Sequence, residues 1–167
     1  MDSGSHRESG LSKSVWSDAD FDQMGWHDAT VHGLAVHTDE EAETFLSRLL
    51  LDLDYIVRWV HPVPPEKYFT FWVSPATLVF DGVWDLEGDI GCAGLVPSLE
   101  IVDLHRSLSD DGRHDQPLWH IEGLRFDLKF RASGYAQYLR QPPVLIPGQS
   151  LSVAERGGFA FTEFGFT

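Results

Sequence analysis

The chain has 167 residues, a formal net charge of -14 and a single cysteine. A chain of this length is expected to form one domain that buries on the order of 70% of its unfolded surface, so neither a disulfide nor a metal is needed to hold a core. The negative charge argues against nucleic acid and anionic membranes as partners, because both would repel the protein.

The cysteine count and the apolar pattern indicate a cytoplasmic protein. One cysteine cannot form an internal disulfide, which fits a reducing compartment. Residues 1–15 are polar and lack the apolar centre of a secretory leader. No apolar run approaches the roughly 20 residues that cross a bilayer, so we predict no membrane contact.

The N-terminal part is predicted to be a tail followed by one helical turn. Residues 1–14 are rich in serine and glycine and show no hydrophobic periodicity, which is typical of disorder. We therefore expect residues 1–15 to form a disordered tail and residues 16–167 to form a single β-rich domain. Ser17 and Asp20 resemble a capping box that opens a short helix, which ends before Gly25.

The centre of the chain contains its most apolar run. Residues 30–37 alternate as a first strand would, and residues 38–43 would form an acidic turn. The run Leu49–Val60 follows. As a strand, it places leucines and aromatic residues on one face and Asp52 and Asp54 on the other.

The same run also fits an amphipathic helix. Thr38 and the three acidic residues after it resemble a helix N-cap with an acidic first turn, and apolar residues recur at helical spacing up to Pro62. A helix would leave Leu51, Tyr55 and Trp59 on its polar face, whereas a strand groups them with the other apolar residues. Because β-forming residues are also frequent here, we predict a strand.

The rest of the chain is predicted to be strands as well. Residues 68–90 give two or three of them, interrupted at Pro75 and at Asp81-Gly82, where we expect a tight turn or a bulge. Further strands are expected over residues 99–105, 118–124, 124–132 and 135–140. This spacing predicts a mainly β fold, an antiparallel β-sandwich or barrel with one short N-terminal helix.

Side chains near residue 30 could meet the two carboxylates of the central run. His27, Asp28 and His32, together with Asp52 and Asp54, have the ligand types of a divalent-metal site. The two aspartates would lie about 6.7 Å apart on one strand face, close enough to share an ion with a neighbouring histidine. His27, His32, Asp52 and Asp54 are therefore the candidate metal ligands. No other cofactor is predicted.

A structural role explains the same aspartates. Asp52 or Asp54 could pair with an arginine of a neighbouring strand, and the candidates are Arg58, Arg125 and Arg131. If this face is covered, such pairing becomes obligatory, because an unpaired buried carboxylate is costly. Asp28 could likewise cap a turn through backbone N–H groups.

Trp72 is the aromatic residue that could serve a ligand. It lies on the strand face opposite Phe69 and Phe71, so it would line a groove for a peptide or small ligand if that face is open. The alternative is that Trp72 belongs to the core. The candidate ligand-binding residues are His27, Asp28, Asp52, Asp54, Arg58 and Trp72.

Signs of catalysis are weak. Cys92 lies among small and apolar residues without an adjacent base, which is typical of a packed thiol. The chain contains neither a Gly-x-Ser-x-Gly elbow nor a glycine-rich loop before a lysine. The sequence therefore favours a protein that is not an enzyme.

Acidic residues are distributed unevenly along the chain. Asp and Glu concentrate in residues 18–115, whereas basic residues slightly outnumber them from Leu124 onward. A solvated acidic surface explains this distribution, and so does an acidic face that docks a basic protein partner. Self-association is a further alternative for the partner.

Three motifs resemble those of a family of uncharacterised bacterial proteins, a domain of unknown function. The motifs are Trp-His-Asp-x-x-Val-His from Trp26, Asp-Leu-Asp-Tyr-Ile-x-x-Trp from Asp52, and Pro-Ala-Thr-Leu-Val-Phe from Pro75. The resemblance covers roughly residues 26–156, supports the strands and implies no activity. A His-Asp step entering the first strand of a small β-rich domain is also similar, more distantly, to proteins that confer immunity to secreted bacterial toxins.

Two functions follow as hypotheses. The first is a non-catalytic binding domain, in one form immunity-like, whose acidic face docks a basic protein partner. The alternative is a small-ligand or metal-binding β-barrel enzyme that uses His27, Asp28, Asp52 and Asp54.

Overall fold

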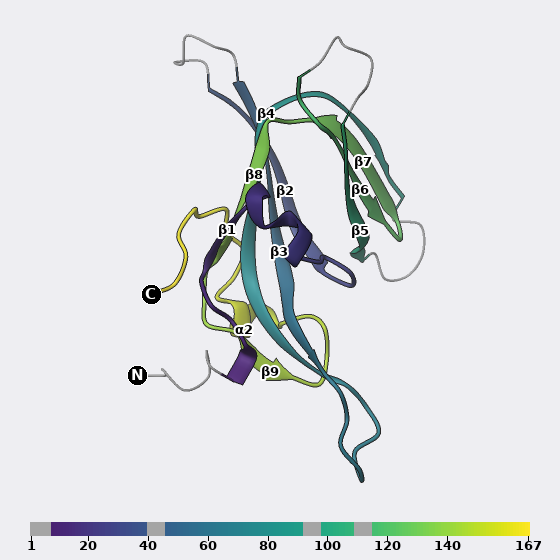
Figure 1. Ribbon diagram of the computed structural model, residues 1–167, viewed down its shortest axis with the longest axis vertical. Helices are drawn as coiled ribbons and strands as arrows, with labels where there is room; N and C mark the ends of the chain where they lie inside the picture. Colours follow the sequence, from purple (N-terminus) through teal and green to yellow (C-terminus); the bar gives the residue numbers. More distant parts are fainter. Residues whose placement is uncertain (1–7, 40–45, 92–97, 109–114) are drawn as a thin grey trace.

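The computed structural model describes residues 8–39, 46–91, 98–108 and 115–167 (Figure 1). The prediction for Cys92 lies outside these residues, as does the predicted acidic turn from residue 40 onward. In chain order, the elements are β1 (Val15–Ser17), η1 (Asp18–Gln23, a 3-10 helix), β2 (Thr30–Asp39), β3 (Leu46–Val60), β4 (Thr70–Ile90), β5 (Leu99–Ser107), β6 (Leu118–Gly123), β7 (Phe126–Arg131), β8 (Gly134–Leu139), β9 (Val144–Ile146) and α2 (Val153–Arg156).

The strands form one antiparallel sheet that closes into a ring. Their order is β1-β8-β4-β3-β2-β5-β6-β7, and β7 also pairs with β4. Figure 1 shows β5, β6 and β7 as a layer that faces β2, β3 and β8. The predicted fold class, a mainly antiparallel β-sandwich or barrel, is confirmed.

Strand β4 connects the two layers. Its first part pairs with β3 and its last part with β7, so the two or three strands predicted over residues 68–90 are one long strand. The strand can turn because it is bulged: Gly82 and Asp85 have φ of 62° and 55°, and the pairing register shifts near both residues. The irregularity predicted at Asp81-Gly82 is thus a bulge inside a strand, while Pro75 stays paired with Asp54.

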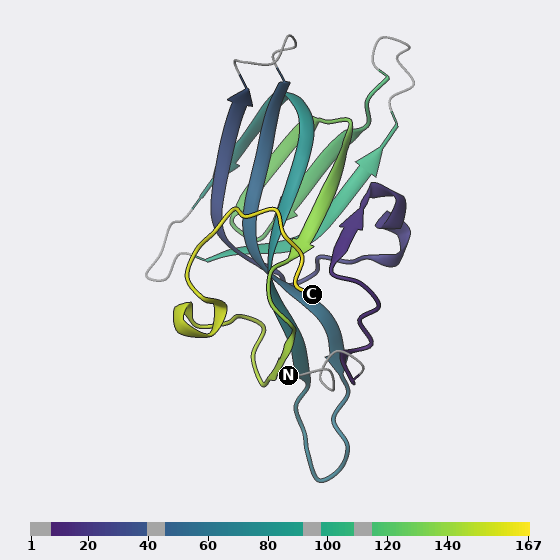
Figure 2. The same ribbon diagram turned by 90° about the vertical axis from the view of Figure 1, so that its left-hand side faces the viewer.

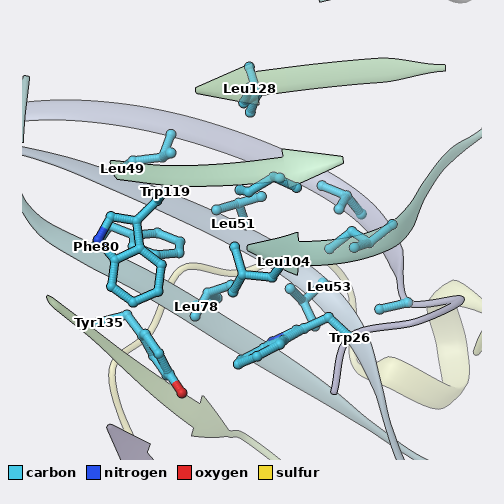
Figure 3. Close-up of a cluster of buried hydrophobic side chains, with 14 of the residues drawn as sticks. Trp26, Leu49, Leu51, Leu53, Leu78, Phe80, Leu104, Trp119, Leu128 and Tyr135 are labelled. Atoms are coloured by element: carbon cyan, nitrogen blue, oxygen red, sulfur yellow. The ribbon is translucent and has the colours of Figure 1, made fainter. Parts of the chain in front are cut away.

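The main core lies between the two layers (Figure 3). Leu49, Leu51 and Leu53 of β3 are fully buried there, as their alternation predicts. Trp119 of β6 belongs to the same core from the opposite layer and makes edge-on contacts with neighbouring rings, including Phe80 at 5.2 Å between centroids. The strand predicted over Leu49–Val60 is therefore confirmed, and the helical alternative is wrong.

The outer face of β3 is covered by the C-terminal strap, which we define as residues 149–163. Figure 2 shows α2 beside the strands and the segment that follows it crossing in front of them. Beneath it is a second small core, in which Leu151 packs against Ile56 of β3 and Phe71 and Val73 of β4. Both faces of β3 are therefore buried over its central part.

The part of the chain that packs against the body begins before residue 16, the predicted start of the domain. Residues 8–14 lie against the body: Leu11 packs on the main core, and the Ser14 carbonyl accepts a hydrogen bond from the Leu139 N–H at 2.9 Å. The prediction of a disordered tail is therefore wrong for residues 8–15, of which Val15 already belongs to β1. The short helix predicted after Ser17 is η1, opened by the capping box of Ser17 and Asp20. No helix in the described part of the chain is long and apolar enough to span a membrane.

Candidate functional site

Asp52 and Asp54 lie in a buried ion cluster under the C-terminal strap. Their side chains and that of Arg156 are fully buried. The Arg156 guanidinium donates two hydrogen bonds to Asp52, at 2.7 and 2.9 Å, and its Nε donates to Asp54 at 3.1 Å. Arg140 adds a second cation, with Nη2 at 2.7 Å from Asp52 Oδ1. Two carboxylates are thus matched by two guanidinium groups.

The strap supplies further hydrogen-bond donors to the same carboxylates. The Ala160 N–H donates to Asp52 Oδ2 at 3.0 Å, and the Leu151 N–H donates to Asp54 Oδ2 at 2.9 Å. The Ser150 hydroxyl also donates to Asp54 Oδ2, at 3.0 Å. Every carboxylate oxygen of the pair therefore has at least one partner, as buried charges require.

Local structure places Arg156 at this point. Ser152 and Glu155 form a capping box that opens α2, and Gly157, with φ of 73°, ends the helix after one turn. Arg156 is the last residue of α2, and its Nη1 also donates to the Gly158 carbonyl at 2.6 Å. A four-residue helix thus serves to aim one guanidinium at β3.

The cluster shifts the pKa values of both aspartates. Burial by itself would raise the pKa of Asp52, but hydrogen bonds from Arg156 and Arg140 outweigh it and hold the pKa below its ordinary value. The pKa of Asp54 is lowered in the same way, against burial, by hydrogen bonds from His32 and the Leu151 N–H. Both carboxylates therefore stay ionised at neutral pH.

The arginine partners predicted for these aspartates are wrong. Asp52 and Asp54 pair with Arg140 and Arg156, not with Arg58, Arg125 or Arg131. Arg58 is exposed and donates to the Glu8 carbonyl at 3.3 Å, while Arg131 donates to the Gln116 carbonyl at 3.1 Å. The true partners follow Asp52 by 88 and 104 residues. Only the tertiary fold brings them to this face.

Of the predicted imidazoles, His32 joins the cluster, with Nε2 at 2.7 Å from Asp54 Oδ2. His27 instead contacts its neighbour Asp28, Nδ1 to Oδ1 at 2.9 Å, in a turn where Asp28 has φ of 66°. Asp28 also accepts a hydrogen bond from Gln149 at 2.8 Å. In the described ranges, no three His, Cys, Asp or Glu side chains gather as metal ligands would.

Trp72 is buried, with 8% of its surface exposed, and it pairs with Leu145 of β9. The open face that a Trp72 groove requires is therefore covered. Arg58 lies opposite Trp72 in the register, although its own side chain is exposed.

A different candidate site lies on the outer face of the layer formed by β5, β6, β7 and the end of β4. Four carboxylates lie directly opposite one another across these strands, and we call them the acidic row: Asp103, Glu122, Asp127 and Asp89. The side chains of Asp103, Glu122 and Asp127 are 56%, 46% and 44% exposed. The row is thus accessible along its length.

A second row of cross-strand pairs lies beside the acidic row: His105, His120, Lys129 and Glu87. His105 Nε2 lies 2.8 Å from Glu122 Oε2, and His120 contacts Asp127. The two imidazole rings are 5.4 Å apart between centroids. Across both rows, five carboxylates therefore face one lysine and two histidines.

Two hollows lie at the ends of the acidic row. One, of about 350 Å³, is lined by Glu87, Asp89, Asp127 and Lys129. The other, of about 380 Å³, lies between the η1 region and β5 and includes Asp103 and His105 in its wall. The negative face is therefore hollowed at both ends.

Comparisons with family models, characterised proteins and solved structures give no match to this chain. The resemblance to uncharacterised bacterial proteins and to immunity proteins stays a prediction. The function must therefore be argued from the geometry of the chain itself.

Sequence reasoning missed the acidic row as a site. The acidic concentration predicted over residues 18–115 includes Asp89 and Asp103 but not Glu122 and Asp127, and the row draws on four strands between residues 89 and 127. A signal existed in Asp103, Glu122 and Asp127, which each occupy a polar position of an alternating strand. The register of the strands aligns these positions across the sheet, and this register cannot be deduced from the sequence.

Proposed function

We propose that the protein is a non-catalytic binding domain whose acidic row docks a basic segment of a protein partner. The observation that carries the proposal is the alignment of four carboxylates in register across four strands. Like charges directly opposite one another destabilise a sheet. An arrangement that costs stability is explained if a cationic partner relieves it.

The dimensions of the acidic row suit an extended or helical basic segment. Three inter-strand steps give the row a length of about 14 Å. Its side chains are about half exposed, so they can reach a partner without a rearrangement of the backbone. The net charge of -14 adds long-range attraction for a basic partner and raises its association rate.

The buried ion cluster supports this proposal over the enzyme alternative. Asp52 and Asp54 use all their oxygens within the protein and are covered by the strap. Both aspartates hold the strap against β3. The alternative function, a ligand-binding or metal-binding enzyme that uses His27, Asp28, Asp52 and Asp54, therefore has less support. A toxin-neutralising role is one form of the proposal, and it rests on the sequence resemblance alone.

Two double variants with equal net charge test the proposal. E122Q/D127N removes two charges from the acidic row, while E66Q/D115N removes two exposed charges elsewhere. The probe is a peptide of ten lysines, titrated at low salt by isothermal calorimetry. Exposed ion pairs contribute about 0.5 kcal/mol each, so we expect E122Q/D127N to bind about fivefold more weakly than E66Q/D115N.

Equal affinities of the two double variants would contradict the proposal. In that case the peptide responds to the overall charge, and the alignment of the acidic row has no role in binding. Folding of both variants is checked by circular dichroism before titration.

A further inference from the structure

The hollow between the η1 region and β5 combines an apolar wall with a charged rim. Its volume is about 380 Å³. Phe21, Met24 and Trp26 form the apolar side, and Asp22, Asp103 and Arg106 carry charge around it. Asp103 also forms one end of the acidic row. The hollow is therefore continuous with the face that we propose for binding.

The two carboxylates at this hollow retain free hydrogen-bonding capacity. Asp22 is exposed and forms no ion pair or hydrogen bond with the residues that the structure describes. Asp103 Oδ1 accepts the Leu104 N–H at 2.8 Å, whereas within the described residues Oδ2 has a single long contact, of 3.8 Å to His105 Nδ1. Both groups can accept hydrogen bonds from a cation.

The Arg106 side chain binds other groups of the protein. Its Nη1 donates to the Asp18 carbonyl at 3.2 Å, and its guanidinium lies 4.4 Å from the centroid of the Phe21 ring. In the part of the chain that the structure describes, Arg106 forms no ion pair with Asp22 or with Asp103. Among the described residues that line the hollow, Arg106 therefore leaves the carboxylates of Asp22 and Asp103 without a direct ion pair.

We propose that this hollow is an anchor pocket for one lysine or arginine side chain of the partner. The aliphatic stem of such a side chain would lie along Met24 and Phe21, while its cationic head would bind Asp22 and Asp103. This inference rests on the proposed function and adds to it a defined subsite. A few such anchor side chains contribute most of the binding energy in many protein interfaces.

The experiment uses the 167-residue chain and a small probe that reports on this hollow alone. N-acetyl-arginine amide is titrated, and N-acetyl-citrulline amide, its uncharged isostere, serves as the matched control. Two N–H groups report on the pocket by nuclear magnetic resonance: the Leu104 amide, bonded to Asp103, and the Trp26 indole, bonded to Gln137 at 2.8 Å. We expect saturable shifts of both signals with the arginine probe and none with citrulline.

Variants then assign the binding to the carboxylates. D22N and D103N are each expected to weaken arginine-probe binding about twofold, because each removes one exposed ion pair, and E66Q is expected to leave it unchanged. Asparagine keeps an acceptor for the Leu104 N–H, so D103N should fold normally. The proposal of an anchor pocket would be wrong if the two probes shifted the Leu104 and Trp26 signals equally, or if the arginine probe shifted only the signals of other residues.

The two proposals fail in distinguishable ways. If D22N and D103N leave arginine-probe binding intact while E122Q/D127N still weakens decalysine binding, the anchor pocket is wrong and the acidic row stands. If decalysine binds both double variants equally, the acidic row is wrong whatever the small probe does.

Discussion

Arg156 is the residue that joins the C-terminal strap to the sheet. Its guanidinium contacts both Asp52 and Asp54 and is fully buried with them. Removing one partner of a buried ion pair leaves an uncompensated charge, which costs more than the pair itself contributes. The stability of this region should therefore depend strongly on this single side chain.

We expect R156M to lower the free energy of unfolding by about 3–5 kcal/mol. The matched control is R58M, because Arg58 is exposed and makes one backbone contact at 3.3 Å. Urea denaturation of both variants and the native protein measures the effect. A loss for R156M no greater than that for R58M would mean that the cluster contributes little.

The same cluster predicts how stability depends on pH. Both aspartates have a pKa below the ordinary value, so the folded state holds their protons less tightly than the unfolded state does. Their contribution is complete above the unfolded pKa of about 3.9 and is lost as the pH falls through the lower folded pKa. We expect unfolding free energies measured from pH 7 to pH 2 to fall mainly below about pH 4.

The variant D52N isolates the contribution of one carboxylate to this pH dependence. Its stability should be lower than that of the native protein at pH 7 and should fall less steeply in acid. The carboxyl carbon shift of Asp52 in the native protein gives its pKa independently. An ordinary pKa together with an unchanged acid slope would contradict the assignment.

At the scale of elements, β6 contains the centre of the acidic row. Glu122 lies between Asp103 on β5 and Asp127 on β7, so it faces a like charge on each side. We expect E122Q to raise the free energy of unfolding by about 0.5 kcal/mol at low salt, while it weakens binding of the basic peptide. The glutamine side chain keeps an acceptor for His105.

Thermal unfolding at low and high salt measures this effect. The stabilisation should shrink in 1 M salt, where screening acts over about 3 Å. A variant that is less stable than the native protein at low salt would show that the ion pair with His105 outweighs the repulsion.

Elements differ in how far the sequence predicts them. The alternation of Leu49, Leu51 and Leu53 predicted β3 and its inner face, because a period of two residues is a local property of a strand. Strand β4 was predicted as several strands, because Asp81-Gly82 signals a turn as readily as a bulge. Only pairing with β3 and β7 decides between the two.

At the scale of the whole molecule, the C-terminal strap closes the outer face of the sheet. Deleting residues 148–167 removes Leu151 from the second core and Arg156 from the cluster, and it leaves Asp52 with Arg140 as its remaining cation. We expect a larger loss of stability than for R156M, because apolar burial and charge compensation are lost together.

Circular dichroism and urea denaturation of the truncated chain measure this loss. The R156M variant serves as the reference, because it keeps the strap backbone and its hydrogen bonds. A truncated chain as stable as R156M would mean that the strap acts through Arg156 alone.

The sequence by itself determined the mainly β class, the inner face of β3 and the polar identity of its outer face, because alternation and local capping are encoded within a few residues. It did not determine which cations meet Asp52 and Asp54, since Arg140 and Arg156 arrive from the C-terminal part of the chain. The sequence also did not predict the acidic row, because the alignment of its residues depends on how four strands pair. Contacts between distant segments are decided by the packing of the whole chain, and only the tertiary structure shows them.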